Sequence, residues 1–166
     1  MSVSSEHGSR LAERATLGSA LRDRVDDVID RVNPLTFDEG GRFGETIEET
    51  FRAATRAATL VVANRIAHGD GEGARPSGTY SPGDGFADVA RLRGASVAEV
   101  AKRCMRWRDC IASVLMDEAE LLGVSRGAVR EALWLTLQSF DATLLRMCGA
   151  YDVERQSLVD ALSRRR

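Results

Sequence analysis

Apolar residues recur at steps of three and four along most of this chain, which is the spacing that lines one face of an α-helix. The first such stripe follows residues 1–8, a polar segment that we expect to be disordered, and it continues to about Asn33. Pro34 should end this helix, because the residue before a proline is disfavoured in helical conformation. A second stripe predicts a helix from about Asp38 to His68.

The middle of the chain changes in character. Residues 69–85 are dense in Gly and Pro, which excludes regular structure and predicts a loop. A short helix is predicted over 86–93. Ser96 and Glu99 then form a capping box, in which the serine accepts a bond from the third backbone N–H and the glutamate reaches back. This pattern begins a long helix that we expect to end at Leu122.

The next boundary is marked by Gly123 and Ser125, because glycine is favoured just after a helix and serine just before one. A C-terminal connector helix is predicted over about 126–162. Its apolar residues approximate a heptad stripe, which is typical of paired helices. As the dimer and signalling face of this helix we predict Phe140, Leu144, Met147, Tyr151 and Leu158.

Composition narrows the fold class to all-α. Hydrophobic residues make up 43% of the chain but aromatic residues only 5%, so the core must consist mostly of Ala, Leu and Val. Small side chains let helices approach closely, and β-branched runs that favour strands are scarce. The sequence therefore predicts an all-α bundle of five or six helices with a long C-terminal helix, in one domain over residues 9–166.

Charge and cysteine usage limit the partners and the compartment. The formal net charge is −2, so overall electrostatics give no reason to expect nucleic-acid binding. No apolar run is long enough to cross a membrane, and the polar start lacks the apolar segment of a secretion signal. Cys104, Cys110 and Cys148 follow no metal-ligand spacing. We interpret them as reduced thiols of a cytoplasmic protein, with a redox sensor as the alternative.

No group of residues has the spacing of a catalytic or metal site. His7 lies in the polar start and His68 at a helix end, so neither has a partner for acid–base or haem chemistry. The acidic residues Asp117, Glu118 and Glu120 lack the paired Glu-x-x-His helices of a di-metal bundle and are typical of a solvated face. We therefore expect no enzymatic activity and no cofactor.

Two tryptophans are the candidates for a ligand pocket. Trp107, Arg108 and Trp134 combine aromatic walls with a cation, which suits an apolar acid. The interpretation that we favour is that both tryptophans are core anchors.

The segment around Gly123 also has the pattern of a helix-turn-helix. Ala119, Gly123 and Val129 supply a small residue at the helix crossing, a glycine in the turn and an apolar anchor. The stretch 122–133 resembles the winged-helix motif of GntR-type repressors. The resemblance implies three DNA contacts, Ser125, Arg126 and Arg130.

The residues that follow favour a different interpretation. A winged helix needs a β-hairpin after its recognition helix, but residues 134–148 keep helical periodicity. Trp134, Leu135 and Leu137 are apolar on more than one side of the helix, so we expect them to be buried.

A second resemblance covers residues 86–158. The segment 96–100 opens a long helix that contains Trp107-Arg108, and a Leu-Gly-Val-Ser corner follows at 122–125. An Ala-Tyr-x-x-Glu-Arg phrase then occurs at 150–155. This order resembles the helical N-terminal module of PucR/CdaR-type transcriptional regulators and is similar to the N-terminal domain of RsbR-like stress-signalling proteins. The resemblance implies an all-α sensory domain, in some members globin-like without haem, that dimerises and signals along its C-terminal helix.

Together these patterns predict a regulatory input domain of a bacterial signalling or transcription regulator. We expect a cytoplasmic homodimer that responds to a small molecule or a partner protein, without catalysis and without a membrane. A DNA-binding repressor is the alternative.

Overall fold

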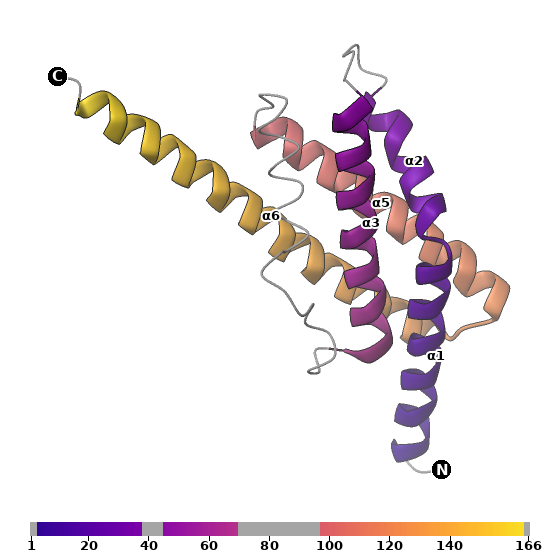
Figure 1. Cartoon of the computed structure of the whole chain (residues 1–166). Helices are drawn as coiled ribbons and strands as arrows, with labels where there is room; N and C mark the ends of the chain where they lie inside the picture. Colours follow the sequence, from indigo (N-terminus) through magenta and orange to yellow (C-terminus); the bar gives the residue numbers. More distant parts are fainter. Residues whose placement is uncertain (1–2, 38–44, 70–96, 165–166) are drawn as a thin grey trace.

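The computed structural model describes residues 3–37, 45–69 and 97–164, and within these ranges the chain is an all-α bundle without strands. Five helices lie in these ranges, and Figure 1 shows their arrangement. Their bounds are α1 Val3–Asp23, α2 Val25–Phe37, α3 Glu45–His68, α5 Val97–Leu122 and α6 Arg126–Ser163. The predicted fold class is confirmed, including the long C-terminal helix. The predicted loop over 69–85 beyond Gly69, the short helix over 86–93 and the Ser96 cap lie outside the described residues.

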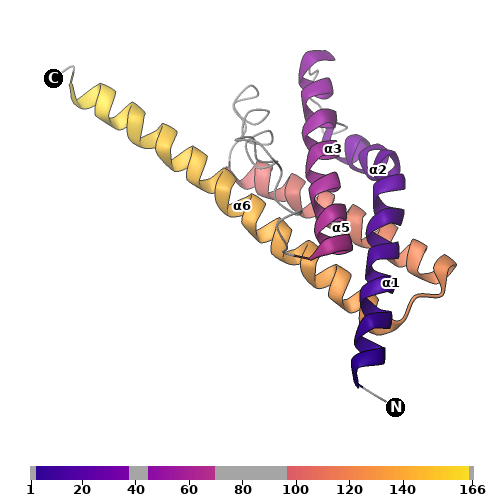
Figure 2. The ribbon, with the colours of Figure 1, turned by 60° about the horizontal axis from the view of Figure 1, so that its bottom comes forward.

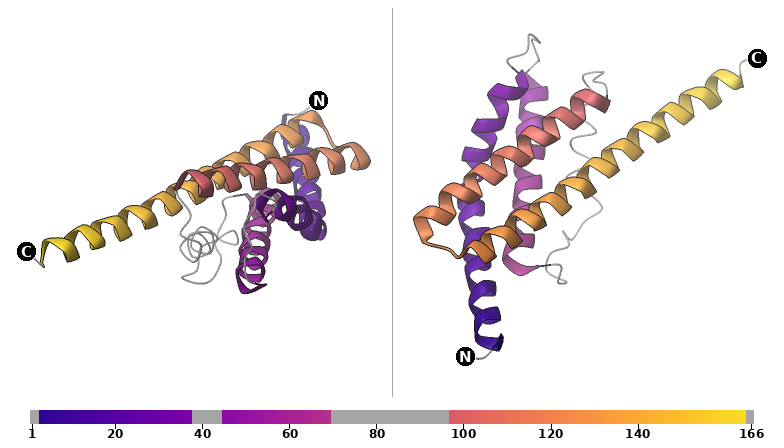
Figure 3. Two further views of the ribbon diagram at one scale, coloured as in Figure 1. Left: turned by 90° about the horizontal axis from the view of Figure 1, so that it is seen from above. Right: turned by 180° about the vertical axis from the view of Figure 1, so that it is seen from behind.

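The helices form two layers that cross each other (Figure 3, left). One layer contains α1 and α3, which lie side by side, and the other contains α5 and α6. Helix α2 continues from α1 and packs against both α3 and α5. Figure 2 and both views of Figure 3 show that the C-terminal end of α6 extends beyond the other described helices. The core lies between the two layers.

The start of the chain differs from the prediction of a single helix ending at Asn33. Helix α1 begins at Val3, inside the segment expected to be disordered, and the helical run is interrupted at Arg24. Helix α2 then continues through Asn33 and Pro34 to Phe37. The prediction that Pro34 ends the helix is wrong. Proline fixes φ near the helical value, so the chain can stay helical for a few residues beyond Pro34, at the cost of the N–H donor that would bond the carbonyl of Asp30.

Helices α1 and α3 approach each other at a glycine. A Cβ atom on Gly18 would lie 2.6 Å from the backbone oxygen of Ala63 and 2.6 Å from the backbone nitrogen of Ala67. Backbone atoms cannot move aside as the tip of a flexible side chain can, so this crossing requires a residue without a side chain. Leu17 and Leu21 of α1 are fully buried beside it.

Trp107 is the largest fully buried side chain and joins the two layers. Its indole Nε1 donates a hydrogen bond to the hydroxyl of Thr59 at 3.0 Å, and Thr59 in turn donates to the carbonyl of Thr55 at 2.8 Å. A buried indole N–H without a partner would be costly, so the threonine on α3 satisfies it. Trp107 is a core anchor.

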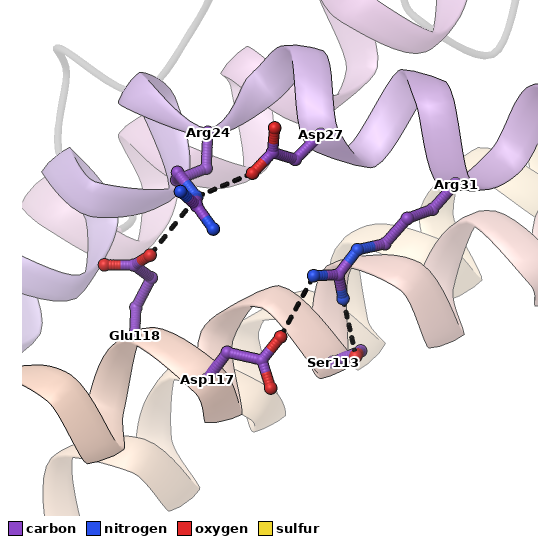
Figure 4. A network of polar contacts seen from close by, with 6 residues as sticks. All are labelled: Arg24, Asp27, Arg31, Ser113, Asp117 and Glu118. Atoms are coloured by element: carbon purple, nitrogen blue, oxygen red, sulfur yellow. Dashed lines mark hydrogen bonds and ion pairs between the residues drawn. The ribbon is translucent and has the colours of Figure 1, made fainter.

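Ion pairs hold α2 between its neighbours. Figure 4 shows Arg24 with Asp27 and Glu118, at 2.7 and 3.3 Å, and Arg31 with Asp117 at 3.0 Å. Arg31 also donates to the hydroxyl of Ser113 at 2.8 Å. Two of the three carboxylates that we predicted on a solvated face of α5 are therefore bound to arginines at the junction of α1 with α2 and on α2. On the other side, Arg52 and Arg56 of α3 pair with Asp30 and Asp26 of α2, respectively.

Candidate functional site

The corner between α5 and α6 is built by the two residues that the sequence singled out. Gly123 has φ of +63°, and a Cβ atom added to it would meet no heavy atom within 4 Å, so glycine is needed for conformation rather than space. The amide of Val124 donates to the carbonyl of Ala119 at 3.1 Å. The hydroxyl of Ser125 accepts from the amide of Ala128, which confirms the predicted N-cap.

Helix α1 closes over this corner. The carboxylate of Glu13 accepts hydrogen bonds from the backbone amide of Ser125, at 3.3 Å, and from its hydroxyl. The negative charge also lies at the positive end of the α6 dipole, which is favourable. Because the Ser125 hydroxyl is bound by a carboxylate of its own chain, a phosphate could reach it only by displacing Glu13.

One turn further on, α1 and α6 are joined by an ion pair. The Nη1 atom of Arg14 lies 2.6 Å from Oε1 of Glu131, with the Arg14 side chain only 10% exposed. Its Nε atom is buried and has no hydrogen-bond partner among the described residues. A buried guanidinium depends on its carboxylate, because losing the partner leaves an uncompensated charge. Breaking the contact between Arg14 and Glu131 would therefore alter how α1 packs on α6.

Next to this ion pair lies an open, largely apolar groove with a volume of about 690 Å³. Its apolar wall comes from α6, and its cations are Arg10 of α1 with Arg126 and Arg130 of α6. The lining residues are Arg10, Arg126, Gly127, Val129, Arg130, Glu131, Leu133, Trp134 and Leu137. The predicted DNA contacts Arg126 and Arg130 thus border an apolar surface, and α6 continues as a helix where a repressor would have its β-hairpin.

The structure does not bring the two predicted pocket tryptophans together. Trp107 is 1% exposed in the core, whereas Trp134 is 59% exposed and lines the groove. Arg108 lies 5.1 Å from the centre of the Phe140 ring, a cation–π contact, and also bonds Asp109. The predicted Trp107–Arg108–Trp134 pocket is therefore not formed, because one tryptophan faces the core and the other faces outward.

Of the residues that we predicted as the dimer and signalling face, those whose side chains the structure describes point toward the chain's own core instead of outward. Phe140 and Met147 are buried in the chain's own core, and Leu144 and Tyr151 are partly buried against it. The side chain of Leu158 lies outside the described set. The stripe follows the heptad spacing because it packs on α5 in the same chain, where Phe140 and Met147 are enclosed and Leu144 and Tyr151 keep only part of their surface exposed.

A second apolar stripe on α6 faces outward. Its members are Trp134, Leu137, Leu145, Val159 and Leu162, each at least 40% exposed. We expected Trp134 and Leu137 to be buried, and within the single chain they are not; only Leu135 is. The sequence held a signal for this face, because positions 134, 137, 141, 145, 148, 152, 155, 159 and 162 follow one another at steps of three and four.

Ten of the eleven large apolar side chains that are exposed in the described ranges belong to α5 and α6. Helix α1 contributes only Leu11. Single exposed apolar residues are normal on protein surfaces, but a row along one helix marks an interaction surface.

The cysteines differ in their surroundings. Burial, followed by the nearness of Cys148, raises the pKa of Cys104 to about 12, and its sulfur lies 3.8 Å from that of Met147. Burial also raises the pKa of Cys110. Both thiols are therefore protonated and unreactive near neutral pH. Cys148 is only partly buried.

No protein-family model, no curated protein and no solved structure matches this chain. Within the described ranges, no three His, Cys, Asp or Glu side chains gather where they could hold a metal ion. None of the described helices combines the length and the apolar character that crossing a membrane requires.

Proposed function

We propose that this chain is a regulatory input domain, sensory or protein-interacting, of a bacterial signalling or transcription regulator. It acts without catalysis, as a homodimer, and it passes its signal along α6. The observation that carries the proposal is the division of α6 into a packed part and a projecting part. The resemblance of residues 86–158 to helical sensory modules supports the same function.

Helix α6 is one uninterrupted rod of 38 residues. Up to Tyr151 it packs on the bundle, whereas the described side chains from Asp152 to Arg164 are all exposed. At a rise of about 1.5 Å per residue, the twelve residues 152–163 extend about 18 Å beyond the packed part. A helix of this kind transmits a tilt or shift at its packed end to its projecting end.

The groove and the corner supply a place where such a shift can begin. Glu13 and the Arg14–Glu131 pair tie α1 to the first turns of α6, directly beside the groove. A small molecule or partner that engages the groove alters this attachment and favours one of two packings of α1 on α6.

DNA binding is less well supported by the geometry. Ser125 is bound by Glu13, α6 continues as a helix past Leu137, and the groove wall is apolar. A titration against random duplex at low salt tests this alternative. We expect no binding, whereas tight binding that weakens steeply with added salt would favour the repressor function.

Sedimentation equilibrium over a wide concentration range tests the proposed function itself. We expect a reversible monomer–dimer equilibrium. Hydrogen exchange at concentrations above and below the midpoint adds a local measure, because the projecting end of a single helix frays in water. Amides of 152–163 should be protected in the dimer and exchange rapidly after dilution. A strictly monomeric chain at the highest concentration would contradict the proposal.

A further inference from the structure

We infer that the outward stripe of α6 is the seam of an antiparallel homodimer, with the two-fold axis at Cys148, so that the projecting end of each α6 covers the Trp134–Leu137 end of the groove on its partner. This inference rests on the proposed homodimer and deepens it, because it names the surface, the direction and the register.

Within the described ranges, no helix of the chain covers the stripe. Trp134 and Leu162 stand at opposite ends of the stripe, 59% and 66% exposed. They are 28 residues apart on one helix, which corresponds to about 42 Å. Because α6 is unbroken between them, Leu162 cannot fold back onto the groove of its own chain.

A second copy in antiparallel orientation brings the two ends together. Cys148 of one copy lies opposite Cys148 of the other. The residue numbers of any two facing positions therefore add up to 296. Trp134 then lies opposite Leu162, and Leu137 lies opposite Val159. Positions seven apart on a straight helix drift by about 20°, which adds up to about 80° over the four heptads from Trp134 to Leu162. The two helices keep this stripe in contact by winding around each other in a left-handed supercoil.

Charge favours this register over a parallel pair. Asp141 and Arg155 occupy the stripe between the apolar ends, and both are exposed. In the antiparallel register Asp141 of each copy lies opposite Arg155 of the other, which forms two oppositely charged contacts by symmetry. In a parallel pair in register, aspartate would face aspartate and arginine would face arginine, which is unfavourable.

The consequence for signalling is that the two chains act on each other. The projecting residues 152–163 of one copy lie against residues 133–144 of the other, which include Trp134 and Leu137 of the groove wall. A ligand that enters the groove of one copy therefore displaces the α6 end of the second copy.

Charge reversal on the full chain tests the register. We expect Asp141→Arg and Arg155→Asp each to weaken dimerisation about tenfold, because each creates two like-charged contacts in place of two attractive ones. The double variant restores opposite charges and should return the dissociation constant to within about threefold of the original. In a parallel pair the single reversals would change little. Arg146→Asp, an exposed reversal on the same helix outside the stripe, is the matched control.

The outcomes separate this inference from the proposed function. Weakening by both single reversals with rescue by the double one supports the antiparallel seam. A dimer that is insensitive to both reversals overturns the seam while leaving the homodimer in place. A chain that stays monomeric overturns both and assigns the face to a different protein. Circular dichroism of each variant confirms that these exposed substitutions leave the fold intact.

Discussion

The α5–α6 hairpin has two apolar faces, one buried in the core and one exposed, and each carries one tryptophan. On the inner face Trp107 is buried, its indole N–H is bound to Thr59, and Cys104 and Met147 pack beside one another. On the outer face Trp134, Leu137, Leu145, Val159 and Leu162 are exposed. Similar residue types at similar helical spacing therefore serve folding on one side and remain available for association on the other.

In the α1–α3 pair, by contrast, the large apolar residues are almost all enclosed. Its crossing is so close that Gly18 cannot carry a side chain, and apart from Leu11 it leaves no large apolar residue exposed among its described positions. Exposed apolar surface in the described ranges is therefore concentrated on α5 and α6 and is not a general feature of helix packing in this chain.

The sharpest way to break this comparison is to truncate each tryptophan. Trp107→Ala should lower the free energy of unfolding by about 3–5 kcal/mol, because it leaves a large cavity in the core. Trp134→Ala should change it by less than about 0.5 kcal/mol at concentrations where the chain is monomeric. Urea unfolding followed by circular dichroism measures both. An equal loss from the two variants would show that the outer face belongs to the monomer's core.

Two glycines offer a smaller test of the same contrast. Gly18→Ala places a methyl group against backbone atoms of α3 and should cost about 1–3 kcal/mol, despite alanine's better helix propensity. Gly149→Ala lies on the exposed side of α6, where an added Cβ meets nothing within 4 Å. There the helix should gain about 0.5–1 kcal/mol. Thermal unfolding of the two variants should therefore shift in opposite directions from the parent chain.

The reactivity of the three thiols is a further test of which face is buried, with a smaller expected effect. At pH 8, and at concentrations where the chain is monomeric, a disulfide reagent should titrate Cys148 first, because it is only partly buried, and Cys148→Ser should remove this fast phase. Rapid reaction of all three thiols in the native chain would contradict the buried inner face.

The buried thiol also predicts a pH dependence of stability. The pKa of Cys104 is raised from 9.0 to about 12, so folding favours the protonated form. Its contribution to stability is complete below pH 9 and is lost as the pH rises toward 12. Urea unfolding between pH 9 and 11 should show a steeper loss of stability for the parent chain than for Cys104→Ala.

Local chemistry in the sequence was sufficient for much of the fold. The end of α5 at Leu122, the glycine and serine of the corner and the long α6 follow from helix-capping preferences, which act within a few residues. The prediction failed at Pro34, where the tertiary structure retains a further turn of α2, and at Arg24, where no local signal marked the interruption.

The candidate site could be predicted only in part. The sequence identified Trp134 and the arginines of the corner, but it assigned the association face to Phe140, Leu144, Met147 and Tyr151, which pack inside the chain. Both apolar stripes of α6 satisfy the helical period, so periodicity alone cannot say which one meets α5. The groove and the Glu13 and Arg14 contacts join α1 to α6 across more than a hundred residues.

The sequence by itself determined that this chain is helical and which residues are apolar enough to be buried. It also determined the position of the corner between α5 and α6. These properties depend on backbone preferences and spacing within one helix. Only the tertiary structure decided which stripe of α6 is enclosed, that Gly18 is the point of closest approach, and that α1 covers the corner. Those outcomes depend on which helices, far apart in the sequence, pack against one another, and the spacing of residues within one helix does not contain that information.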